Sequence, residues 1–327
     1  MPAGAALNAF VEATLEPVVF RKAGVRLPIV QAALQSQHDV AQYLLRHHAN
    51  IPVTIYRADR STRGRFHYTA AIDGFNFTGS RGELQQVLDE LLGGANDALY
   101  VGSTDLGIFF PEMGPANDPG VEGVQGEDGA PVTASLWMGN RTVTAAHYDH
   151  SNNCALCAAG RRRFTLFPPD QIANLYPGPL EPTPGGQVVS MVDLADPDLD
   201  RYPGYATALE NAVSAVLEPG DVIVYPAMWW HEVEALEDFN ILLNWWWNAV
   251  PDHVDTPQTT LLHALMSLRQ RPAHEREAWA AIFDYYVFSD ADRATAHLPE
   301  HVLGALDLGD PSAVRRLRAQ VLRRIQR

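Results

Sequence analysis

Cysteine is scarce in this 327-residue sequence, and long apolar runs are absent. The two cysteines, Cys154 and Cys157, cannot form a disulfide framework, which favours a reducing compartment. No stretch approaches the ~18 uninterrupted apolar residues of a membrane-spanning helix. The first residues carry no basic segment ahead of an apolar one, so no signal peptide is predicted. We therefore expect a cytoplasmic protein that does not enter a membrane.

Positive charge is also scarce. The chain has 24 Lys and Arg against 39 Asp and Glu, a formal net charge of −15 and a pI near 5.1. This balance argues against nucleic acid as a partner, because basic side chains supply most of the affinity for phosphates. Hydrophobic residues make up 46% and charged residues 19%, as in an ordinary globular protein. The length permits one large β domain or two smaller ones.

Short runs rich in β-branched and aromatic residues, separated by Gly and Pro turns, predict strands through the middle of the chain. The expected strands are 52–56, 99–101, 135–138, 142–148, 162–167, 221–225 and 240–247, with a β-like run continuing to 231. Two N-terminal helices are expected, one capped by Ser36 and one opened by the capping box Ser80-x-x-Glu83. Residues 114–130, rich in Gly, Pro and acidic residues, are expected to be a long exposed loop. The acidic residues of the Pro- and Gly-rich insert 176–205 are expected to be solvated; the alternative is an acidic rim that selects a basic substrate.

From Thr256 the pattern becomes helical. Thr256 is a predicted N-cap with Pro257 at the first helical position, and apolar residues recur at helical spacing along 279–286 and 314–322. A β core followed by helices indicates α+β or mainly-β architecture. We expect a domain at 1–255 with the β core and a helical segment at 256–327, whose apolar faces pack on the core or on a second subunit.

A His-x-Asp pair and a distant histidine are candidate metal ligands. His147 and Asp149 lie two residues apart in an expected strand, so their side chains project to the same side. His231, near the end of a later β-like run, would complete a 2-His-1-carboxylate facial triad, which holds Fe(II) and leaves positions open for other ligands. The competing interpretation is a chance pair among twelve histidines, with His231 as a core residue.

The triad lies inside a longer pattern. It runs from His147-Tyr-Asp149 through Asn153 and Gly160-Arg-Arg-Arg-Phe-Thr-Leu-Phe-Pro-Pro169 to Pro219-Gly-Asp221, Pro226-x-x-Trp229-Trp230-His231 and Asn244-Trp-Trp246. Over roughly residues 95 to 250, this pattern resembles the JmjC/cupin-like family of Fe(II)- and 2-oxoglutarate-dependent dioxygenases. Within that family it most resembles the branch that contains the asparaginyl hydroxylase of hypoxia-inducible factor. The resemblance implies a mainly-β (α+β) fold: a double-stranded β-helix, or jelly-roll, core with N-terminal helices and a C-terminal helical segment used for dimerisation.

The resemblance also implies roles for individual residues. It puts iron on His147, Asp149 and His231, the cosubstrate 2-oxoglutarate near Tyr100, Thr144, Asn153, Arg162 and Asn244, and the substrate near Trp246. Arg162 stands where the family usually has a lysine, although a guanidinium can also bind a carboxylate bidentately. Gly102 replaces a substrate-binding glutamine of the hydroxylase, so specificity for protein asparagine is not carried over.

Two of these assignments depend on strand geometry. Thr144 and His147 are three residues apart, so both can face the same site only across a β-bulge or a strong twist. Strand alternation puts Arg161 and Arg163 on the face opposite Arg162. For the remaining notable residues we expect structural roles: buried thiols for the two cysteines, and core aromatics for Trp137, Trp229, Trp245 and Trp247.

The reaction implied by the resemblance uses O2 to decarboxylate 2-oxoglutarate to succinate and CO2 while the substrate is hydroxylated. A peptide or protein side chain is the expected substrate, with a small molecule as the alternative. Two other classes remain open. One is a cupin metalloenzyme, loaded with zinc or manganese or using O2, that does not use 2-oxoglutarate. The other is a non-catalytic binding protein. A homodimer formed through the C-terminal helices is the expected assembly.

Overall fold

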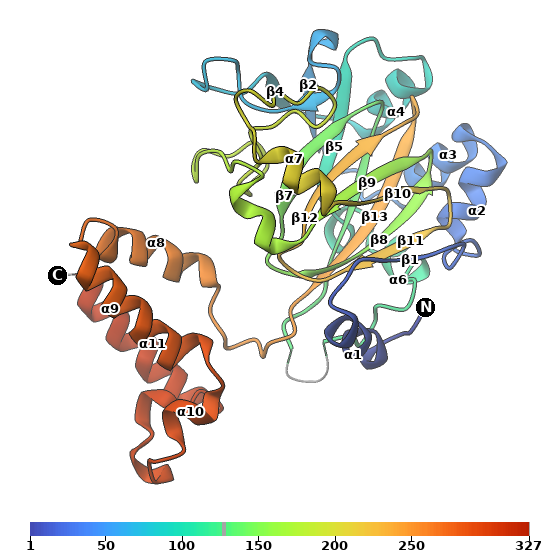
Figure 1. Cartoon of the computed structure of the whole chain (residues 1–327). Helices are drawn as coiled ribbons and strands as arrows, with labels where there is room; N and C mark the ends of the chain where they lie inside the picture. Colours follow the sequence, from blue (N-terminus) through green and yellow to red (C-terminus); the bar gives the residue numbers. More distant parts are fainter. Residues whose placement is uncertain (126–128, 327) are drawn as a thin grey trace. The chain divides into compact units, whose positions relative to one another are not determined.

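The computed structural model describes residues 1–125 and 129–326. The chain divides into two compact units, Met1–Ala249 and Val250–Arg327, each described by itself (Figure 1). The division falls after residue 249, a few residues before the boundary expected at 255.

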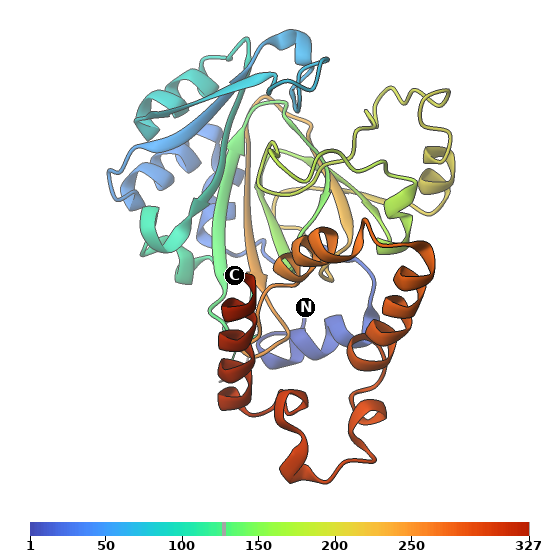
Figure 2. The ribbon, with the colours of Figure 1, turned by 90° about the vertical axis from the view of Figure 1, so that its left-hand side faces the viewer.

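Two β-sheets form the centre of the first unit (Figures 1 and 2). The large sheet has eight strands in the order β1 (Val18–Phe20), β11 (Val222–Tyr225), β8 (Asn152–Ala159), β13 (Asn240–Trp247), β6 (Thr133–Gly139), β5 (Ala98–Asp105), β2 (Val53–Ala58) and β4 (Phe77–Gly82). The small sheet has five, in the order β10 (Val213–Leu217), β9 (Arg162–Phe167), β12 (Trp230–Ala235), β7 (Val143–Tyr148) and β3 (Arg65–Phe66). Neighbouring strands are antiparallel, except that β3 runs parallel to β7.

Successive strands from β6 to β13 are distributed between the two sheets. The large sheet takes β6, β8, β11 and β13, and the small sheet takes β7, β9, β10 and β12. The chain therefore winds around a shared interior as a double-stranded β-helix, which closes the sheets on each other. The expected jelly-roll core with helices on both sides of it in the sequence is confirmed.

Alternation along β13 gives its two faces different roles. Leu243, Trp245 and Trp247 are buried against the N-terminal helices, whereas Asn244 and Trp246 face the interior between the sheets. A fully buried side chain of this size contributes about 1.5–3 kcal/mol relative to an exposed one. This apolar face thus fixes the strand register that presents Asn244 and Trp246 inward.

Helices cover the outer face of the large sheet (Figures 1 and 2). They are α1 (Ala5–Thr14), α2 (Pro28–Gln35), α3 (Gln37–His47) and α4 (Leu84–Leu92), with the short helices α5 (Leu106–Phe109) and α6 (Met113–Ala116) nearby. The outer face of the small sheet is covered by the segment between β9 and β10, which contains the 3₁₀ turn Pro169–Ala173 and α7 (Tyr205–Glu210). A further 3₁₀ turn, Arg60–Thr62, follows β2.

Two sequence-based expectations were wrong. Ser80 is not part of a capping box, because it lies in β4, paired with Ile55 of β2, and α4 begins after Glu83 without a side-chain cap. Residues 114–125 are not a wholly exposed loop. Asn117 is fully buried there and accepts a hydrogen bond from the backbone N–H of Ile29. Residues 126–128 of the expected loop lie outside the described residues.

The second unit is helical. It contains α8 (Pro257–Leu268), α9 (Ala273–Phe283), the π-helical turn Asp284–Phe288, α10 (Ala291–Thr295), the 3₁₀ turns Glu300–Val302 and Gly304–Leu306, and α11 (Pro311–Ile325). Among its described residues only Ala294 and Ala313 are buried. No helix among the described residues of either unit is long and apolar enough to cross a membrane.

Candidate metal centre

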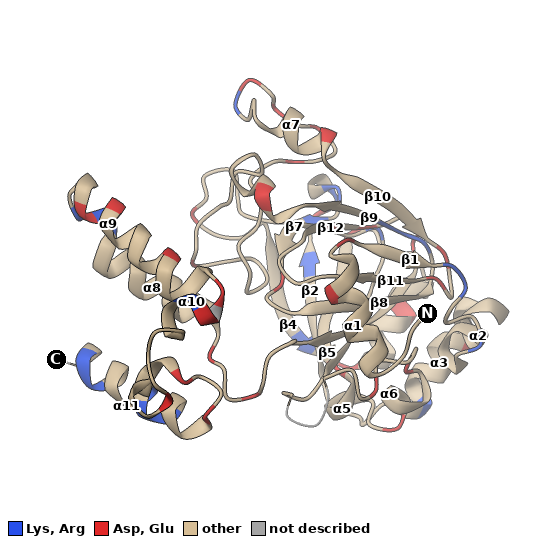
Figure 3. Ribbon diagram, turned by 60° about the horizontal axis from the view of Figure 1, so that its bottom comes forward, with Lys and Arg blue, Asp and Glu red and all other residues tan. Residues whose placement is uncertain are grey.

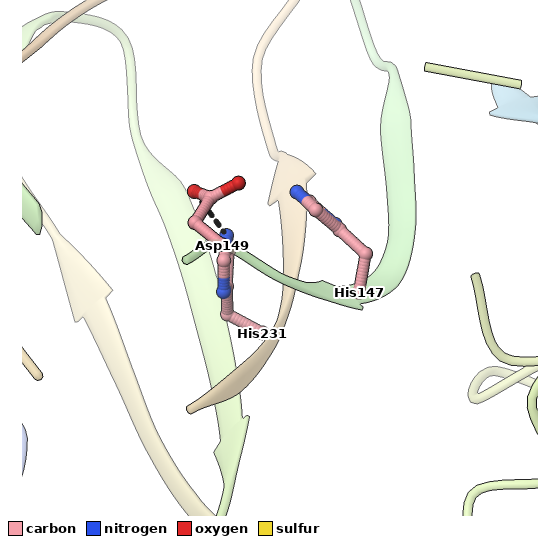
Figure 4. A group of neighbouring side chains, drawn as sticks. All are labelled: His147, Asp149 and His231. Carbon is pink, nitrogen blue, oxygen red and sulfur yellow. Dashed lines mark ion pairs between the residues drawn. The ribbon is translucent and has the colours of Figure 1, made fainter. Parts of the chain in front are cut away.

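Two neighbouring strands of the small sheet carry the three expected metal ligands. His147 lies near the end of β7 and Asp149 follows just beyond it, so strand alternation turns both side chains to the same side. His231 lies in β12 directly opposite His147 in the antiparallel pairing. Figure 4 shows the three side chains converging from these positions.

The three side chains are close enough to share one metal ion. One ligand atom from each residue can be chosen so that all three lie within 4.8 Å of one another. Nε2 of His231 is 3.6 Å from Oδ2 of Asp149, the contact dashed in Figure 4, and the two imidazole rings are 4.3 Å apart. Two imidazole nitrogens and one carboxylate oxygen are the donor set of a facial triad.

Backbone carbonyls fix the tautomer of both histidines. Nδ1 of His147 lies 2.9 Å from the carbonyl oxygen of Ala145, and Nδ1 of His231 lies 3.0 Å from that of Trp229. A carbonyl only accepts, so in the neutral imidazole each Nδ1 carries the proton and each Nε2 keeps its lone pair. This is how proteins usually orient metal-binding histidines.

The environment also favours the protonation states that a metal requires. Burial raises the pKa of Asp149, but the nearby imidazoles and two hydrogen-bond donors outweigh it, so its pKa lies below the ordinary value. Burial and the neighbouring His147 lower the pKa of His231 to about 4, against the opposing effect of Asp149. A neutral imidazole beside an ionised carboxylate is the state that binds a metal ion.

A second cluster of polar side chains lies between the two sheets. The hydroxyls of Tyr100 (β5) and Thr144 (β7) are 3.4 Å apart, and the guanidinium of Arg162 (β9) is next to Tyr100. Burial raises the pKa of Tyr100, and Arg162 opposes that rise. Three of the residues that the resemblance placed near 2-oxoglutarate are therefore neighbours in the fold.

Arg162 is a buried cation beside Tyr100 that lacks a carboxylate partner in the described part of the chain. Its exposed fraction is 2%, its Nε has no hydrogen-bond partner, and Nη2 donates to the carbonyl of Trp137 at 3.4 Å. Among the described residues it forms no ion pair with a carboxylate. Arg161 and Arg163 point to the other face, where they pair with Glu237 and Glu234, as strand alternation predicts.

A β-bulge brings Thr144 to this group. His231 pairs with His147, but Val233 pairs with Thr144, so β7 has one more residue than β12 between the two pairs. Ala145 and Ala146 together lie opposite the single residue Glu232. Both alanines are buried on the outer face of the small sheet, away from the interior between the sheets. The bulge that the Thr144 assignment requires is present.

The remaining assigned residues contact Asp149 and one another. Trp246 donates from Nε1 to Oδ2 of Asp149 at 2.9 Å, and Asn153 donates to the same oxygen at 3.2 Å. Asn244 donates to Asn153 at 3.4 Å. The indole nitrogen of Trp246, the residue expected beside the substrate, thus bonds a metal ligand.

Trp137, expected only in the core, also belongs to the site. Its Nε1 donates to Oδ1 of Asn244 at 2.6 Å, and its ring packs against those of Tyr100 and Trp246. Its position in β6 carried the signal, because Leu136 and Met138 on either side face the helices and leave Trp137 facing inward. By contrast, Trp229, Trp245 and Trp247 are buried core residues.

Gly102 is explained by the same aromatic packing. A Cβ atom at this position would lie 3.1 Å from Cε1 of Tyr100 and 3.3 Å from Cζ3 of Trp137. A side chain at this position would therefore press on both rings, which would have to move by a few tenths of an ångström. The two cysteines are free and buried, on opposite faces of β8, as expected.

Fold and site together define a jelly-roll protein with a potential metal centre between its sheets. The model of the cupin-like domain family matches residues 5–253, so the chain belongs to this JmjC-type cupin-like family.

Relatives of the chain carry several different names. Human HSPB1-associated protein 1 is 32% identical over 168 residues, covering 50% of this chain and 33% of the relative. Lysine-specific demethylase JMJ31 of Arabidopsis thaliana is 28% identical over 128 residues, covering 37% and 23%. The tRNA wybutosine-synthesizing protein 5 of Gallus gallus is 34% identical over 105 residues, covering 32% and 30%. The matched stretches cover about a third or less of each relative's length.

Proposed function

We propose that this chain is an Fe(II)- and 2-oxoglutarate-dependent oxygenase that hydroxylates a peptide or protein side chain. The observation that carries the proposal is the buried Arg162, which has no carboxylate partner among residues 1–125 and 129–326 and lies between the same two sheets as the His147–Asp149–His231 triad. A metal centre alone is compatible with many cupin enzymes. A metal centre together with a buried cation that can bind an anionic cosubstrate is compatible with fewer classes of cupin enzyme.

The residues present fit Fe(II). Both Nε2 atoms keep their lone pairs, Asp149 is ionised, and a triad of this kind occupies one face of the metal. When bound, Fe(II) would supply the activation of O2 that hydroxylation needs. The protein orients the two histidine ligands through the carbonyls of Ala145 and Trp229.

The residues present also fit a dicarboxylic acid. Leaving an arginine buried without a counter-ion costs several kcal/mol, so the site favours a ligand that brings negative charge. Tyr100 and Thr144 add hydroxyl groups that can donate to the same carboxylate. Arg162 occupies the usual lysine position, and its planar fork binds a carboxylate through two parallel hydrogen bonds.

The substrate proposal draws on the resemblance to the asparaginyl hydroxylase branch. Gly102 has no side chain to replace the substrate-binding glutamine of that hydroxylase, so the proposal does not include specificity for asparagine. The relatives' names refer to lysine demethylation and to wybutosine synthesis in tRNA, and so do not agree on one substrate. The net charge of −15 disfavours a nucleic acid.

For the assembly we propose a homodimer built on the C-terminal unit. Large apolar side chains of this unit are exposed in the single chain, including Leu262, Met266, Phe288 and Leu322 at 49, 72, 77 and 52%. A helical unit with so little buried surface needs a partner to cover it. The arginines of α11 and the acidic residues of α9 and α10, coloured blue and red in Figure 3, provide opposite charges within the same unit.

Calorimetry with Mn(II) as a redox-inert replacement for Fe(II) tests the enzyme proposal. The wild-type protein is expected to bind 2-oxoglutarate only after Mn(II) is added, and the His147→Ala variant is expected to bind neither. Binding of Mn(II) without any binding of 2-oxoglutarate would reject the proposal in favour of a cupin enzyme with other chemistry. Failure to bind Mn(II) would favour a non-catalytic protein. If 2-oxoglutarate binds, candidate peptides and small molecules can then be compared as substrates.

A further inference from the structure

We infer that two tryptophans, Trp137 and Trp246, are positioning residues that orient the carboxylate of Asp149 for metal binding. The inference rests on the proposed metal centre and adds to it a hydrogen-bond chain that begins about three side chains away. The hydrogen bonds determine which oxygen of Asp149 remains available to bind the metal.

One oxygen of Asp149 is held by two donors. Nε1 of Trp246 lies 2.9 Å and Nδ2 of Asn153 lies 3.2 Å from Oδ2. Two N–H donors use the two lone pairs of that oxygen. Oδ2 is also the oxygen that lies 3.6 Å from Nε2 of His231, whereas Oδ1 receives no hydrogen bond from any described residue. Oδ1 is therefore the oxygen whose lone pairs these donors leave for a metal ion.

The donor role of Asn153 is set by a residue that does not touch Asp149. An asparagine side chain can be turned so that either its oxygen or its nitrogen faces a neighbour, and the choice follows from the network. An indole N–H can only donate. Nε1 of Trp137 donates to Oδ1 of Asn244 at 2.6 Å, which turns the nitrogen of Asn244 toward its other neighbour.

The same reasoning continues along the chain. Nδ2 of Asn244 donates to Oδ1 of Asn153 at 3.4 Å, so the nitrogen of Asn153 is the atom left to face Asp149. Every hydrogen bond therefore runs from Trp137 toward the carboxylate. The direction of all these hydrogen bonds is fixed by the indole N–H of Trp137, because this group can donate but cannot accept.

Strand geometry keeps these residues in place. Asn244 and Trp246 alternate onto the same face of β13, and Trp246 pairs across the sheet with Asn153 of β8. Trp137 enters from β6 on the other side of β13, and its ring meets that of Trp246 edge to face at 5.8 Å. Asn153 and Asn244 are buried, so water does not replace a lost partner readily.

Loss of either indole N–H has a defined consequence. Without Trp246, Oδ2 of Asp149 loses one donor and the carboxylate can rotate. Without Trp137, the amide of Asn244 is free to turn over, and Asn153 can then present its oxygen to the carboxylate, which repels it. Changes in groups that orient metal ligands typically weaken metal affinity by about 10- to 100-fold.

Titration of the metal-free protein with Co(II), followed by its visible d–d absorption, measures this effect without turnover. We expect Trp246→Phe to weaken Co(II) binding about 10- to 100-fold and Trp137→Phe to weaken it by up to about 10-fold. Trp247→Phe is the matched control, because Trp247 lies on the same strand and donates from its indole to Asn8 at 2.8 Å, outside the site. It should leave Co(II) affinity unchanged.

A double-mutant cycle separates positioning from packing. In an Asn153→Ala background, Trp137→Phe should cause no further loss, because the link to Asp149 is already broken. Asn244→Ala breaks the chain at another link and should weaken binding as Trp137→Phe does, which covers the case in which the tryptophan variant folds poorly. Unchanged affinity in the Trp246 and Trp137 variants, or an equal loss in Trp247→Phe, would overturn the inference. Absence of Co(II) binding in the wild type, or equal binding by His147→Ala, would instead overturn the proposed metal centre and the inference with it.

Discussion

Thr144 and His147 face the same interior although they are three positions apart along β7. Regular alternation would turn them to opposite faces. The pairing with β12 advances by two residues while β7 advances by three, and the extra residue forms a β-bulge at Ala145–Ala146. The carbonyl of Ala145 also accepts from Nδ1 of His147. One irregularity in the strand thus aligns a metal ligand and brings a hydroxyl toward Arg162.

The hydroxyl of Thr144 is expected to contribute to 2-oxoglutarate binding. Thr144→Val keeps the shape of the side chain but removes the hydroxyl, and a hydrogen bond to a charged group is worth about 1.5–3 kcal/mol. We expect a loss of 2-oxoglutarate affinity of at least about tenfold, with metal affinity unchanged. Calorimetry on the Mn(II)-loaded variant checks this, with Thr144→Ser as the control that retains the hydroxyl. Equal affinity in Thr144→Val and wild type would remove Thr144 from the site.

Arg162 is expected to be the main anchor of the cosubstrate. Replacing it by glutamine removes the charge, and we expect 2-oxoglutarate affinity to fall by about 100-fold or more, because a buried charged hydrogen bond would be lost. Arg162→Lys retains a point charge without the fork and should recover part of the affinity.

Arg163→Gln is the matched control for Arg162, since Arg163 is exposed and pairs with Glu234 on the other face of the same strand. Such exposed pairs are worth about 0–1 kcal/mol, so this variant should bind 2-oxoglutarate like the wild type. If Arg162→Gln bound 2-oxoglutarate as tightly as Arg163→Gln does, the cosubstrate assignment would be wrong.

The apolar surface of the C-terminal unit predicts a concentration-dependent dimer. Leu262→Asp combined with Phe288→Asp would put charges on side chains that are 49 and 77% exposed in the single chain. Such charges disfavour an apolar interface and should not harm the fold of the first unit. Light scattering after size-exclusion chromatography should show a dimer for the wild type and a monomer for the variant. A monomeric wild type at micromolar concentration would contradict the proposal.

His67 is expected to make stability depend on pH apart from the metal centre. Burial and the charge of Arg65 lower the pKa of His67 to about 4, while Nε2 lies 3.0 Å from the carbonyl of Ser190 and Asp193 opposes the shift. Between the ordinary pKa near 6.5 and the lowered value, the unfolded chain binds a proton that the folded chain does not. The free energy of unfolding should therefore fall as pH decreases through this window, by at most about 1.4 kcal/mol per pH unit from this group.

The variant His67→Gln can keep a hydrogen bond to Ser190 but does not titrate. Urea unfolding at several values between about pH 7 and about pH 5 should show a shallower pH dependence for this variant than for the wild type. Identical slopes for the two proteins would mean that His67 titrates in the folded state as it does in the unfolded chain.

Much of the β core was predictable because most of its strands are marked by runs of β-branched and aromatic residues. Gly and Pro turns also mark where many of these strands end. The bounds of β9 and β13 match the expectation, and the inward direction of Arg162 followed from alternation among three consecutive arginines. The expected strands did not include β8, because its sequence Asn-Asn-Cys-Ala-Leu-Cys-Ala-Ala contains none of the β-branched and aromatic residues that marked the other strands.

Tertiary pairing decided the remaining differences. Ser80 and Glu83 have the spacing of a capping box, but pairing of Ser80 with Ile55 places it in a strand instead. Alternation along β6 indicates that Trp137 faces inward, but its hydrogen bond to Asn244 depends on the pairing of β6 with the adjacent strand β13, which the sequence does not show. Local patterns predict which face a residue occupies, whereas its partner across the sheet depends on the folded register.

Visible absorption of the Fe(II)-loaded protein under anaerobic conditions, before and after addition of 2-oxoglutarate, tests the central claim most directly. The account predicts a new charge-transfer band in the wild type that is absent from His147→Ala, because the band requires Fe(II) and 2-oxoglutarate in contact. Iron bound without such a band would contradict the use of 2-oxoglutarate, and no bound iron would contradict the metal centre.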